Sequence, residues 1–367
     1  MVINIKPVDT LFFRNSKPFE VGGENWAEIV FPPLPRTVYG ALRTYLILQK
    51  GSIEEFKQGK FEEDLGTIDT YGKFKLKGIF LNKDGTLYFK IPYDSVLIEG
   101  KDKLKTLELM EKPKLMISNY PLEYVLFYRG GEKVEEPSGW IDTYELKKYL
   151  TGKDATVSKN SFYKISEKIG IARDEKSLSS KESYIYKIPL VQLERDVCIS
   201  AVLEDSLRCL FDKEVDMLQL GGERKSAVFE IDKTDIDDDL NDLKDLNVDL
   251  KDGFFKVCLL TPTVFKKGWL PSWIDEATKE GKIGKLKVKL VAAATGRYIK
   301  VGGWDLARNK PKPLKKAVPA GAVYYFKLLE GDEKDVFETF HFKNISDEFS
   351  EEGFGFSVVG VVNGDGR

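Results

Sequence analysis

The chain has 367 residues, of which 42% are hydrophobic and 32% are charged. This length suits two or three domains with packed cores, and no apolar run reaches the ~20 residues that a membrane span needs. The N-terminus has no secretory hydrophobic region, and the three cysteines neither form a metal-spaced pair nor divide evenly into disulfides. We therefore expect a soluble, cytoplasmic protein.

The first hundred residues predict a strand over 1–8, a helix over 36–50, and a hairpin of 73–81 with 86–93 across Asp84-Gly85. Gly40 in the middle of the helix costs ~1 kcal/mol relative to alanine, so we expect close packing against another element there. The expected buried stripe of this helix, and the glycine that follows it, are Val38, Leu42, Tyr45, Leu46 and Gly51.

The middle of the chain is less regular. Residues 100–150 read as inserted mixed structure, and the lysine-rich segment 150–185 reads as an extended hairpin that contains Arg173. Residues 189–203 alternate as a strand does, and 204–217 predict a helix.

An acidic stretch over 232–252 holds nine Asp against three Lys, a local charge of −6. The net charge is −2, so the rest of the chain carries about +4, which is compatible with a nucleic-acid partner. An EF-hand over Asp235–Asp239 fails because the central glycine and terminal glutamate are missing. We expect a solvated linker or an exposed helix, and a domain boundary.

The second half predicts a strand over 253–261, a short helix over 271–281, strands over 285–300 and 319–329, a helical patch within 333–350, and a strand over 355–363. Each half thus reads as strand, helix, two strands, helix, glycine loop and strand, the order of the ferredoxin-like or RRM-like fold. We predict an α+β protein with two such domains, 1–231 and 253–367, an insert at about 100–185, and the acidic linker between them.

Two glycine-rich loops run straight into apolar strands, at 218–229 and 351–359, and a backbone of this kind can come close to a phosphate. Beside Gly221 and Gly222, the cations Arg224 and Lys225 could share a phosphate with exposed N–H groups, or could be solvated charges on a tight turn. In the second loop Phe354 and Phe356 alternate with Gly353 and Gly355. One ring should point inward and the other could stack on a base, although core packing explains both equally well.

Two basic segments follow the acidic stretch. Lys285, Lys287 and Lys289 give one strand a lysine face, which could track a nucleic-acid backbone or protect a sheet edge. Residues 308–316 carry five cations around two prolines, so this loop could follow RNA, touch an acidic partner, or simply be solvated.

A catalytic constellation is not visible in the sequence. His341, the only histidine, lies between two phenylalanines, which favours a structural role. Gly221-Gly222 is followed by Glu223-Arg224-Lys225, where a two-metal palm would need a second acid. P-loop, GxGxxG, GxSxG and zinc-ligand patterns are also missing, so we predict no catalytic residues, metal or cofactor.

Several longer strings resemble one family. The chain is similar to the Cmr-type third subunit of type III-B CRISPR effector complexes, within the RAMP superfamily, over most of its length and most strongly at 254–362. The segments that carry the resemblance are Val301–Pro313, with Trp304 and Arg308, Val318–Tyr325, Asp9–Arg14, Pro35–Arg43, Leu220–Arg224 and Gly353–Gly360.

The resemblance implies a non-catalytic subunit that binds the 5′ tag of the CRISPR RNA and docks on the large polymerase-like subunit and on the backbone RAMP subunits. Stacking on bases would come from aromatics near the glycine loops. Arg173 would pin the RNA strand where it leaves the cleft. The expected RNA-binding residues are Arg14, Arg36, Thr37, Arg43, Arg173, Gly221, Gly222, Arg224, Lys225, Arg297, Trp304, Arg308, Gly353, Phe354, Gly355 and Phe356.

Two other functions stay open. A RAMP-type endoribonuclease that processes repeat RNA is possible because relatives with the same glycine loop cut RNA, although one histidine among aromatics suits this poorly. A pure scaffold, whose basic loops meet an acidic neighbour and never touch RNA, is the third hypothesis.

Overall fold

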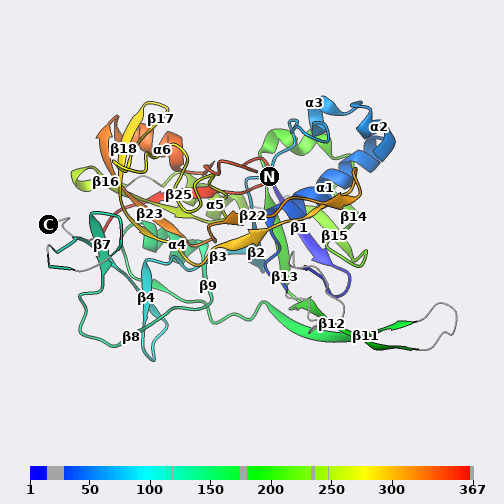
Figure 1. Ribbon diagram of the computed structural model, residues 1–367, viewed down its shortest axis with the longest axis horizontal. Coiled ribbons are helices and arrows are strands. Elements are labelled where there is room, and N and C mark those ends of the chain that lie inside the picture. Colours follow the sequence, from blue (N-terminus) through cyan, green and yellow to red (C-terminus); the bar gives the residue numbers. More distant parts are fainter. Residues whose placement is uncertain are drawn as a thin grey trace. The chain divides into compact units, whose positions relative to one another are not determined.

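The computed structural model describes residues 1–14, 29–113, 115–116, 119–173, 180–232, 236–246 and 248–363. It is a mixed α and β structure with two compact units (Figure 1). The first unit comprises 1–84, 161–232 and 300–315, and the second comprises 85–160, 233–299 and 316–367. The units are therefore interleaved in sequence, whereas we expected two consecutive segments. A boundary at 232 does coincide with the start of the acidic stretch.

Five strands of the first unit form an antiparallel sheet in the order β14-β15-β1-β13-β2. Numbered along the chain, β15, β1, β13 and β2 have the spatial order 4-1-3-2. The bounds are β1 (Val2–Pro7), α1 (Pro35–Lys50), α2 (Ile53–Lys57), α3 (Glu62–Leu65), β2 (Gly78–Lys83), β11 (Tyr163–Arg173), β12 (Ser180–Leu193), β13 (Val197–Val202), η1 (Asp205–Leu210), β14 (Val215–Gln219), β15 (Ser226–Ile231), β20 (Trp304–Asp305) and β21 (Lys310–Pro311).

Helix α1 confirms the prediction over 36–50. Pro35 begins it, as suits a residue whose missing N–H would be unpaired anyway. Val38, Leu42 and Leu46 are buried as expected, and Tyr45 is half-buried. Gly40 corrects a second expectation, because a Cβ there would meet no atom of the described residues within 4 Å. The described residues therefore show no close packing at this glycine.

Two predictions in the first unit need revision. The strand over 189–203 is two strands, because β12 ends at Leu193 and β13 begins at Val197. The helix over 204–217 is wrong beyond its first part. Only the 3₁₀ helix η1 forms, and β14 follows, since the chain there pairs with β15. The extended hairpin is confirmed as β11 paired with β12.

The second unit contains an antiparallel sheet in the order β17-β18-β23-β16-β25-β24. Its strands β18, β23, β16 and β25 have the order 2-3-1-4 along the chain. The bounds are β16 (Phe254–Leu259), β17 (Glu280–Ile283), β18 (Leu286–Ala294), β23 (Val323–Glu330), α6 (Glu333–Phe340), β24 (Lys343–Asn344) and β25 (Phe356–Gly360).

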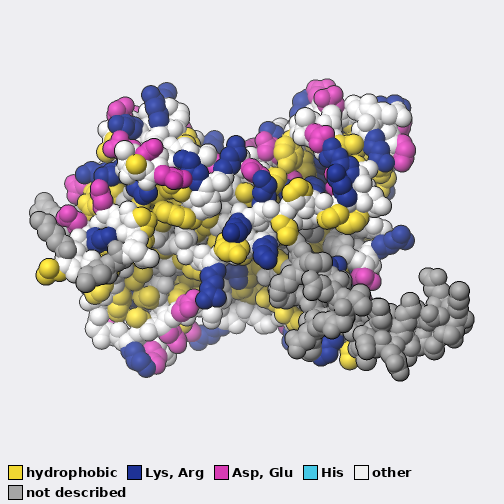
Figure 2. All heavy atoms as spheres, in the orientation of Figure 1, with side chains coloured by type: hydrophobic (Ala, Val, Ile, Leu, Met, Phe, Trp, Pro, Cys, Tyr) yellow, Lys and Arg dark blue, Asp and Glu magenta, His cyan; other side chains and the backbone are white. Residues whose placement is uncertain are grey.

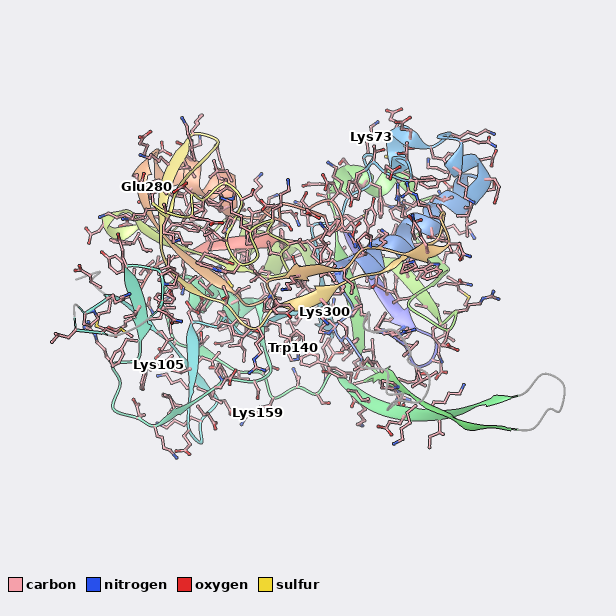
Figure 3. All side chains as sticks on the ribbon, in the orientation of Figure 1. Lys73, Lys105, Trp140, Lys159, Glu280 and Lys300 are labelled. Carbon is pink, nitrogen blue, oxygen red and sulfur yellow. The ribbon has the colours of Figure 1, made fainter. Side chains whose placement is uncertain are left out.

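Smaller elements complete the second unit. Trp140 on β9 is buried, and Lys90 Nζ lies 3.7 Å from the centre of its ring (Figure 3). The bounds are β3 (Thr86–Lys90), β4 (Ser95–Ile98), β5 (Lys103–Thr106), β6 (Glu108–Glu111), β7 (Tyr124–Phe127), β8 (Val134–Glu135), β9 (Trp140–Asp142), α4 (Thr143–Leu150), β10 (Ala155–Thr156), α5 (Ile236–Lys244) and η2 (Lys251–Gly253). Strands β19 (Ile299–Val301) and β22 (Lys315–Ala317) lie where the chain enters and leaves the first unit's last segment.

The turn between β2 and β3 has the predicted chemistry. Asp84 has φ 52° and Gly85 has φ 85°, and a type I′ turn needs positive φ at both central positions. Glycine and aspartate reach this left-handed region more easily than other residues do. The dipeptide Asp84-Gly85 alone therefore predicts the position of this turn.

The predicted helix over 271–281 is absent from the structure. Asp275 Oδ1 accepts hydrogen bonds from the N–H groups of Ala277 (3.0 Å) and Thr278 (2.8 Å), which closes a turn. Lys279 then has φ 60°, and β17 begins at Glu280. Aspartate side chains commonly offer the backbone this alternative to a helix.

The acidic stretch, predicted as a solvated linker or an exposed helix, contains the helix α5, which is packed on one side and has an exposed Asp242. Helix α5 lies against α4, and Leu240, Leu243 and Leu246 are buried. Lys147 of α4 also forms an ion pair with Asp242 at 2.8 Å. The leucines recur every three residues among the aspartates, and this spacing gives a helix one apolar side.

Asp94 is the centre of a fully buried polar cluster in the second unit. Its carboxylate accepts hydrogen bonds from the hydroxyls of Tyr149 (2.7 Å) and Tyr325 (2.5 Å), and Lys256 Nζ lies 3.5 Å away. Lys256 Nζ also lies 3.5 Å from the centre of the Tyr149 ring. Burial lowers the pKa of the Lys256 ammonium, and Asp94 opposes this effect. Asp94 thereby ties the segment 85–160 to strands β16 and β23.

Among the described helices, none is long and apolar enough to cross a bilayer.

Candidate functional site

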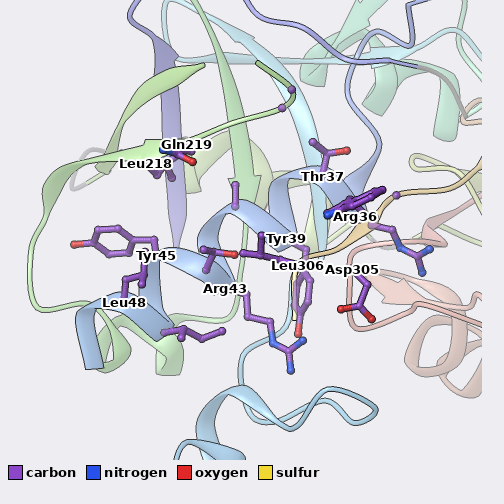
Figure 4. A pocket seen from close by; sticks show the side chains of 18 of the residues that line it. Arg36, Thr37, Tyr39, Arg43, Tyr45, Leu48, Leu218, Gln219, Asp305 and Leu306 are labelled. Carbon is purple, nitrogen blue, oxygen red and sulfur yellow. The ribbon is translucent and has the colours of Figure 1, made fainter. Parts of the chain in front are cut away.

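A groove of about 1640 Å³ lies in the first unit, lined by α1, β14 with the loop that follows it, and the segment 303–314 (Figure 4). Figure 2 shows hydrophobic side chains around a hollow on this part of the surface, with Lys and Arg side chains beside them. The groove brings together residues from three distant parts of the sequence. The predicted site residues among its lining are Arg14, Arg36, Thr37, Arg43, Gly221, Gly222 and Trp304.

Helix α1 presents Arg36, Thr37 and Gly40 to the groove. Arg36 is only 6% exposed. Its Cδ lies 3.1 Å from the position a Cβ on Gly303 would take, so a side chain at Gly303 would crowd the arginine. The glycine therefore lets the chain before Trp304 lie directly on the Arg36 stem.

Arg43 also lines the groove, but its guanidinium is used internally. Nε donates to the carbonyl oxygen of Leu65 at 2.9 Å and Nη2 donates to that of Thr67 at 2.6 Å. The guanidinium carbon lies 4.9 Å from the centre of the Phe56 ring. Arg43 thus anchors the loop after α3 to α1. Its predicted phosphate contact stays a prediction, and the structure adds this architectural role.

The first glycine loop approaches the chain near Phe12. Gly222 donates its N–H to the Phe12 carbonyl oxygen at 2.9 Å, and a Cβ on Gly221 would lie 2.5 Å from that oxygen. Gly221 has φ 80°, which favours glycine. The glycines are therefore needed for a close backbone approach, and the loop's exposed face borders the groove.

The two cations of this loop differ. Arg224 is exposed, has φ 51°, and makes no hydrogen bond or ion pair with the described residues. Lys225 Nζ donates to Thr10 Oγ1 at 3.0 Å and lies 3.4 Å from Asp9 Oδ2. A hydrogen bond from the Thr10 N–H and the charge of Lys225 lower the pKa of Asp9. Of these two cations, Arg224 is therefore the one without a partner among the described residues.

Exposed apolar side chains surround the groove. Trp304 and Leu306, on and next to β20, are both 56% exposed. Three more groove residues, Leu48, Met217 and Leu314, are also more than half exposed. Large apolar groups gathered at one concave surface are typical of a binding site.

Arg308 holds one wall of the groove. Its Nη2 donates to both carboxylate oxygens of Asp69 at 2.6 Å, and Nη1 donates to Asp305 Oδ2 at 3.2 Å. The hydrogen bond to Asp69 raises the pKa of the Arg308 guanidinium. Arg308 is therefore paired with carboxylates, where we expected it to contact a phosphate.

The second glycine loop does not join this groove. Phe354 and Phe356 are both fully buried in the second unit, where Phe354 packs against the ring of Phe349 and Phe356 packs against that of Phe342. Strand β25 pairs with β16 and β24 along its two edges, and all five of its residues are buried. Neither ring is free to stack on a base, which corrects that expectation. Gly353 and Gly355 have φ 95° and 75° and are also buried.

The remaining predicted cations lie elsewhere. Arg297 is exposed in the second unit. Arg173 ends β11, but its side chain lies outside the described residues. The lysines of β18 are paired with carboxylates, namely Lys287 with Glu280 at 3.2 Å and Lys289 with Glu123 at 2.6 Å. Their opposite face is buried, and β17 covers the edge.

His341 has the expected structural environment. It is 6% exposed; its Nε2 lies 2.8 Å from the carbonyl oxygen of Leu243, and its Nδ1 accepts the Val359 N–H at 3.1 Å. Nε2 therefore carries the proton. Burial lowers the pKa of this imidazole. Among the residues that the structure describes, no three His, Cys, Asp or Glu side chains cluster as a metal site would require.

Sequence reasoning missed the apolar rim of the groove. Met217 and Leu48 read as ordinary members of amphipathic elements, and only the fold places them beside Trp304.

Comparison with known proteins gives consistent results. The family described as "CRISPR-associated protein (Cas_Cmr3)" matches residues 3–362. No protein of curated function is similar enough in sequence to match.

Two solved structures are similar in fold. A chain of the type III-B Cmr-beta complex bound to cognate target RNA is 17% identical, with a TM-score of 0.50, and the match covers 89% of this chain and 86% of that one. A chain of the same complex, bound to cognate target RNA and AMPPnP, is 16% identical to this chain, with the same TM-score and the same coverage of both chains. A chain of a type III-A Csm3-Csm4 subcomplex has a TM-score of only 0.35.

Proposed function

We propose, from the premise that this chain belongs to the Cas_Cmr3 family of CRISPR-associated proteins, that it is a non-catalytic RNA-binding subunit of a type III-B effector complex. The groove of the first unit would hold the single-stranded 5′ tag of the guide RNA. One observation carries the proposal: Arg14, Arg36, Trp304 and the first glycine loop, far apart in sequence, line one groove. Cations for phosphates and an exposed aromatic for bases are what single-stranded RNA requires.

The exposed Arg224 would contact the RNA backbone where the strand passes the glycine loop. Arg36 lines the groove, although only 6% of this residue is exposed. The structural likeness to a chain from a complex with target RNA supports an RNA context, at the level of fold. We further propose that the chain docks on the large subunit and on backbone subunits, as the family resemblance implies.

We also propose that the sheet of each unit is a ferredoxin-like core. The strand order 4-1-3-2 in the first unit and 2-3-1-4 in the second supports this, since both are the same order read from opposite edges. Helix α1 follows the first strand in one unit, and α6 precedes the last strand in the other.

The decisive experiment is RNA binding by the assembled complex at several salt concentrations. We expect Arg224→Ala with Trp304→Ala to weaken guide RNA binding and to flatten the salt dependence. A matched control removes two exposed lysines outside the groove, Lys73→Ala with Lys159→Ala (Figure 3). Equal affinity and equal salt slope in the wild type and the groove variant would refute the site.

The alternative function, an endoribonuclease, is supported only by analogy with relatives that cut RNA. His341 argues against it, because its ring is buried and both ring nitrogens are in hydrogen bonds with the backbone. Incubation of the purified chain with repeat RNA separates the two functions. Specific cleavage that His341→Ala abolishes would overturn the non-catalytic proposal. Crosslinking of guide RNA in the intact complex separates RNA binding from a pure scaffold, which would give no crosslink to this chain.

A further inference from the structure

The second unit carries a surface patch of two tyrosines and two cations, which we call the tyrosine patch: Tyr93, Arg297, Tyr298 and Lys316. Tyr93 and Tyr298 are 42% and 54% exposed, and both cations are exposed as well. The chain around all four is described without a break, over 85–113 and 248–363. None of the four lines the groove of the first unit, so the patch is a separate surface.

Tyr93 is held against the backbone just before Arg297. A Cβ on Gly296 would lie 2.6 Å from Cζ of the Tyr93 ring and 3.0 Å from Cγ of Pro319. The Tyr93 N–H also donates to the carbonyl oxygen of Gly321 at 2.8 Å. Gly296 therefore lets the end of the tyrosine ring lie directly on the main chain, and the ring is held in place while much of it stays exposed.

Tyr298 lies close to Tyr93 and has a cation beside its ring. Only Arg297 separates Tyr298 from Gly296, so the backbones at these two positions lie within about 7 Å of each other. Lys316 Nζ lies 4.7 Å from the centre of the Tyr298 ring. Neither tyrosine ring packs against another aromatic ring of the described residues. Both rings therefore keep exposed area for a further planar group.

The two cations of the tyrosine patch differ from most lysines nearby in having no carboxylate partner. Arg297 and Lys316 form no ion pair or hydrogen bond with the described residues, whereas carboxylates pair with the two central lysines of β18. Glu136 acts on Tyr93 instead, because burial and the charge of this carboxylate raise the pKa of the tyrosine. The positive charge of Arg297 and Lys316 is therefore not neutralised within the part of the fold that is described.

The chemistry of the tyrosine patch indicates its ligand. Exposed flat rings bind nucleobases by stacking, and neighbouring cations bind the phosphates between the bases. An acidic peptide would use the two cations but leave both rings without a matching group. A lipid surface would require a larger apolar face than two tyrosines supply. Single-stranded RNA matches the rings and the cations at once, because its bases are not held in a duplex and each has a planar face.

We infer that the tyrosine patch binds single-stranded RNA, with bases stacked on Tyr93 and Tyr298 and a phosphate bound by Arg297. Lys316 adds positive charge beside the Tyr298 ring. This goes beyond the proposed function, which uses only the groove of the first unit, and it does not depend on that groove. The patch would bind RNA and take no part in any chemistry.

Photo-crosslinking in the assembled complex tests the inference and identifies the RNA. One preparation contains guide RNA that carries thiouridine, and a second contains unmodified guide RNA with target RNA that carries thiouridine. After irradiation, the peptides joined to RNA are identified by mass spectrometry. We expect peptides that contain Tyr93 or Tyr298 from one of the two preparations, which shows which RNA occupies the patch. If neither preparation gives such a peptide, the inference is wrong.

Substitutions separate stacking from a structural role. Tyr93→Leu with Tyr298→Leu should lower the affinity of the complex for the crosslinked RNA about tenfold, equivalent to about 1.4 kcal/mol. Tyr93→Phe with Tyr298→Phe should retain the affinity, because stacking needs the ring and not the hydroxyl. Arg297→Gln should lessen the salt slope by about 0.7, the share of one phosphate on a single strand. Since Arg297 is exposed, this variant keeps the inference testable even if the leucine variant fails to fold.

The second unit offers a matched control in Tyr144→Leu. Tyr144 is 69% exposed and Lys148 Nζ lies 5.6 Å from the centre of its ring, but Lys148 is paired with Glu145 at 2.9 Å. This variant should leave RNA affinity unchanged.

The outcomes separate the tyrosine patch from the groove. If the double leucine variant binds both RNAs as wild type does, the inference is wrong and the proposed function stands. If the leucine and phenylalanine variants lose affinity equally, no base stacks on the rings. If Arg224→Ala with Trp304→Ala changes nothing while the leucine variant binds weakly, the proposed groove fails and the tyrosine patch stands.

Discussion

Arg308 and Asp69 are joined by two hydrogen bonds of 2.6 Å although 239 residues separate them. Asp69 lies in the loop that Arg43 anchors to α1, and Arg308 lies in the turn of the β20–β21 hairpin. The pair therefore connects two walls of the groove. Its side chains are 36% and 73% exposed, so solvent screens the pair and its net contribution to stability is small.

Asp69→Asn should strengthen RNA binding, because the change removes a carboxylate beside the groove and releases Arg308 to pair with phosphate. We expect a gain of about two- to fivefold, equivalent to about 0.5–1 kcal/mol, and a salt slope steeper by about 0.7. The control is Glu63→Gln, which removes the same charge from an exposed ion pair with Lys73. If RNA affinity rose equally in both variants, the change in net charge alone would explain it, and the release of Arg308 would not.

Arg43→Lys should destabilise the first unit about as much as Arg43→Ala does. The guanidinium donates to two carbonyl oxygens at once, and a lysine cannot reproduce that planar fork. Loss of two charge-assisted hydrogen bonds should cost about 2–4 kcal/mol in chemical denaturation. Arg224→Ala, at an exposed position, should change stability by less than about 0.5 kcal/mol. Full stability in Arg43→Lys would show that the fork is not needed.

Asp94→Asn should be strongly destabilising, by about 3–5 kcal/mol, because Lys256 would keep a buried charge without its partner. The loss should shrink as pH rises. Burial lowers the pKa of Lys256 in the folded state, so between that lowered pKa and about pH 10.5 the unfolded chain binds more protons, and raising the pH through this window favours folding. Urea titrations at pH 7 and pH 9 test both points. The double variant Lys256→Met with Asp94→Asn should lose less free energy of unfolding than the two single variants lose together.

His341 should make the protein less stable as the pH falls from 7.5 towards 5.5. Its pKa is lowered in the folded state, so the unfolded state takes up the proton first, at about pH 6.5, and gains free energy from it. The chain has one histidine, so its ring signals in NMR report this pKa directly. A titration midpoint at or above 6.5 would contradict the prediction.

Local patterns made parts of the fold predictable. Helix α1 could be read from Pro35 and the spacing of its apolar residues, and the turn between β2 and β3 from Asp84-Gly85. The helix over 271–281 could not be excluded in this way, because the Asp275 side chain competes for the backbone N–H groups. Burial of both Phe354 and Phe356 depends on β25 being an interior strand, which is a property of the whole sheet.

The sequence allowed us to predict which residue types the candidate site contains, but not which of them lie together in space. The cations and glycines of the first loop were identified from residue types alone. The assignment of Arg308 and Arg43 to internal partners arises from contacts with residues 22 to 239 positions away. The apolar rim, likewise, is visible only after Leu48, Met217 and Leu306 are brought to one surface.

The interleaving of the two units has a consequence for synthesis. A ribosome delivers α1 and the first glycine loop long before residues 300–315, which supply the groove wall that contains Trp304. Domains that fold as they emerge usually complete their surfaces in chain order. Here a nascent chain stopped before residue 300 would carry an unfinished groove, so guide RNA capture should begin only on nearly full-length protein. Truncated chains would then be unable to bind guide RNA and so could not withdraw it from complete complexes.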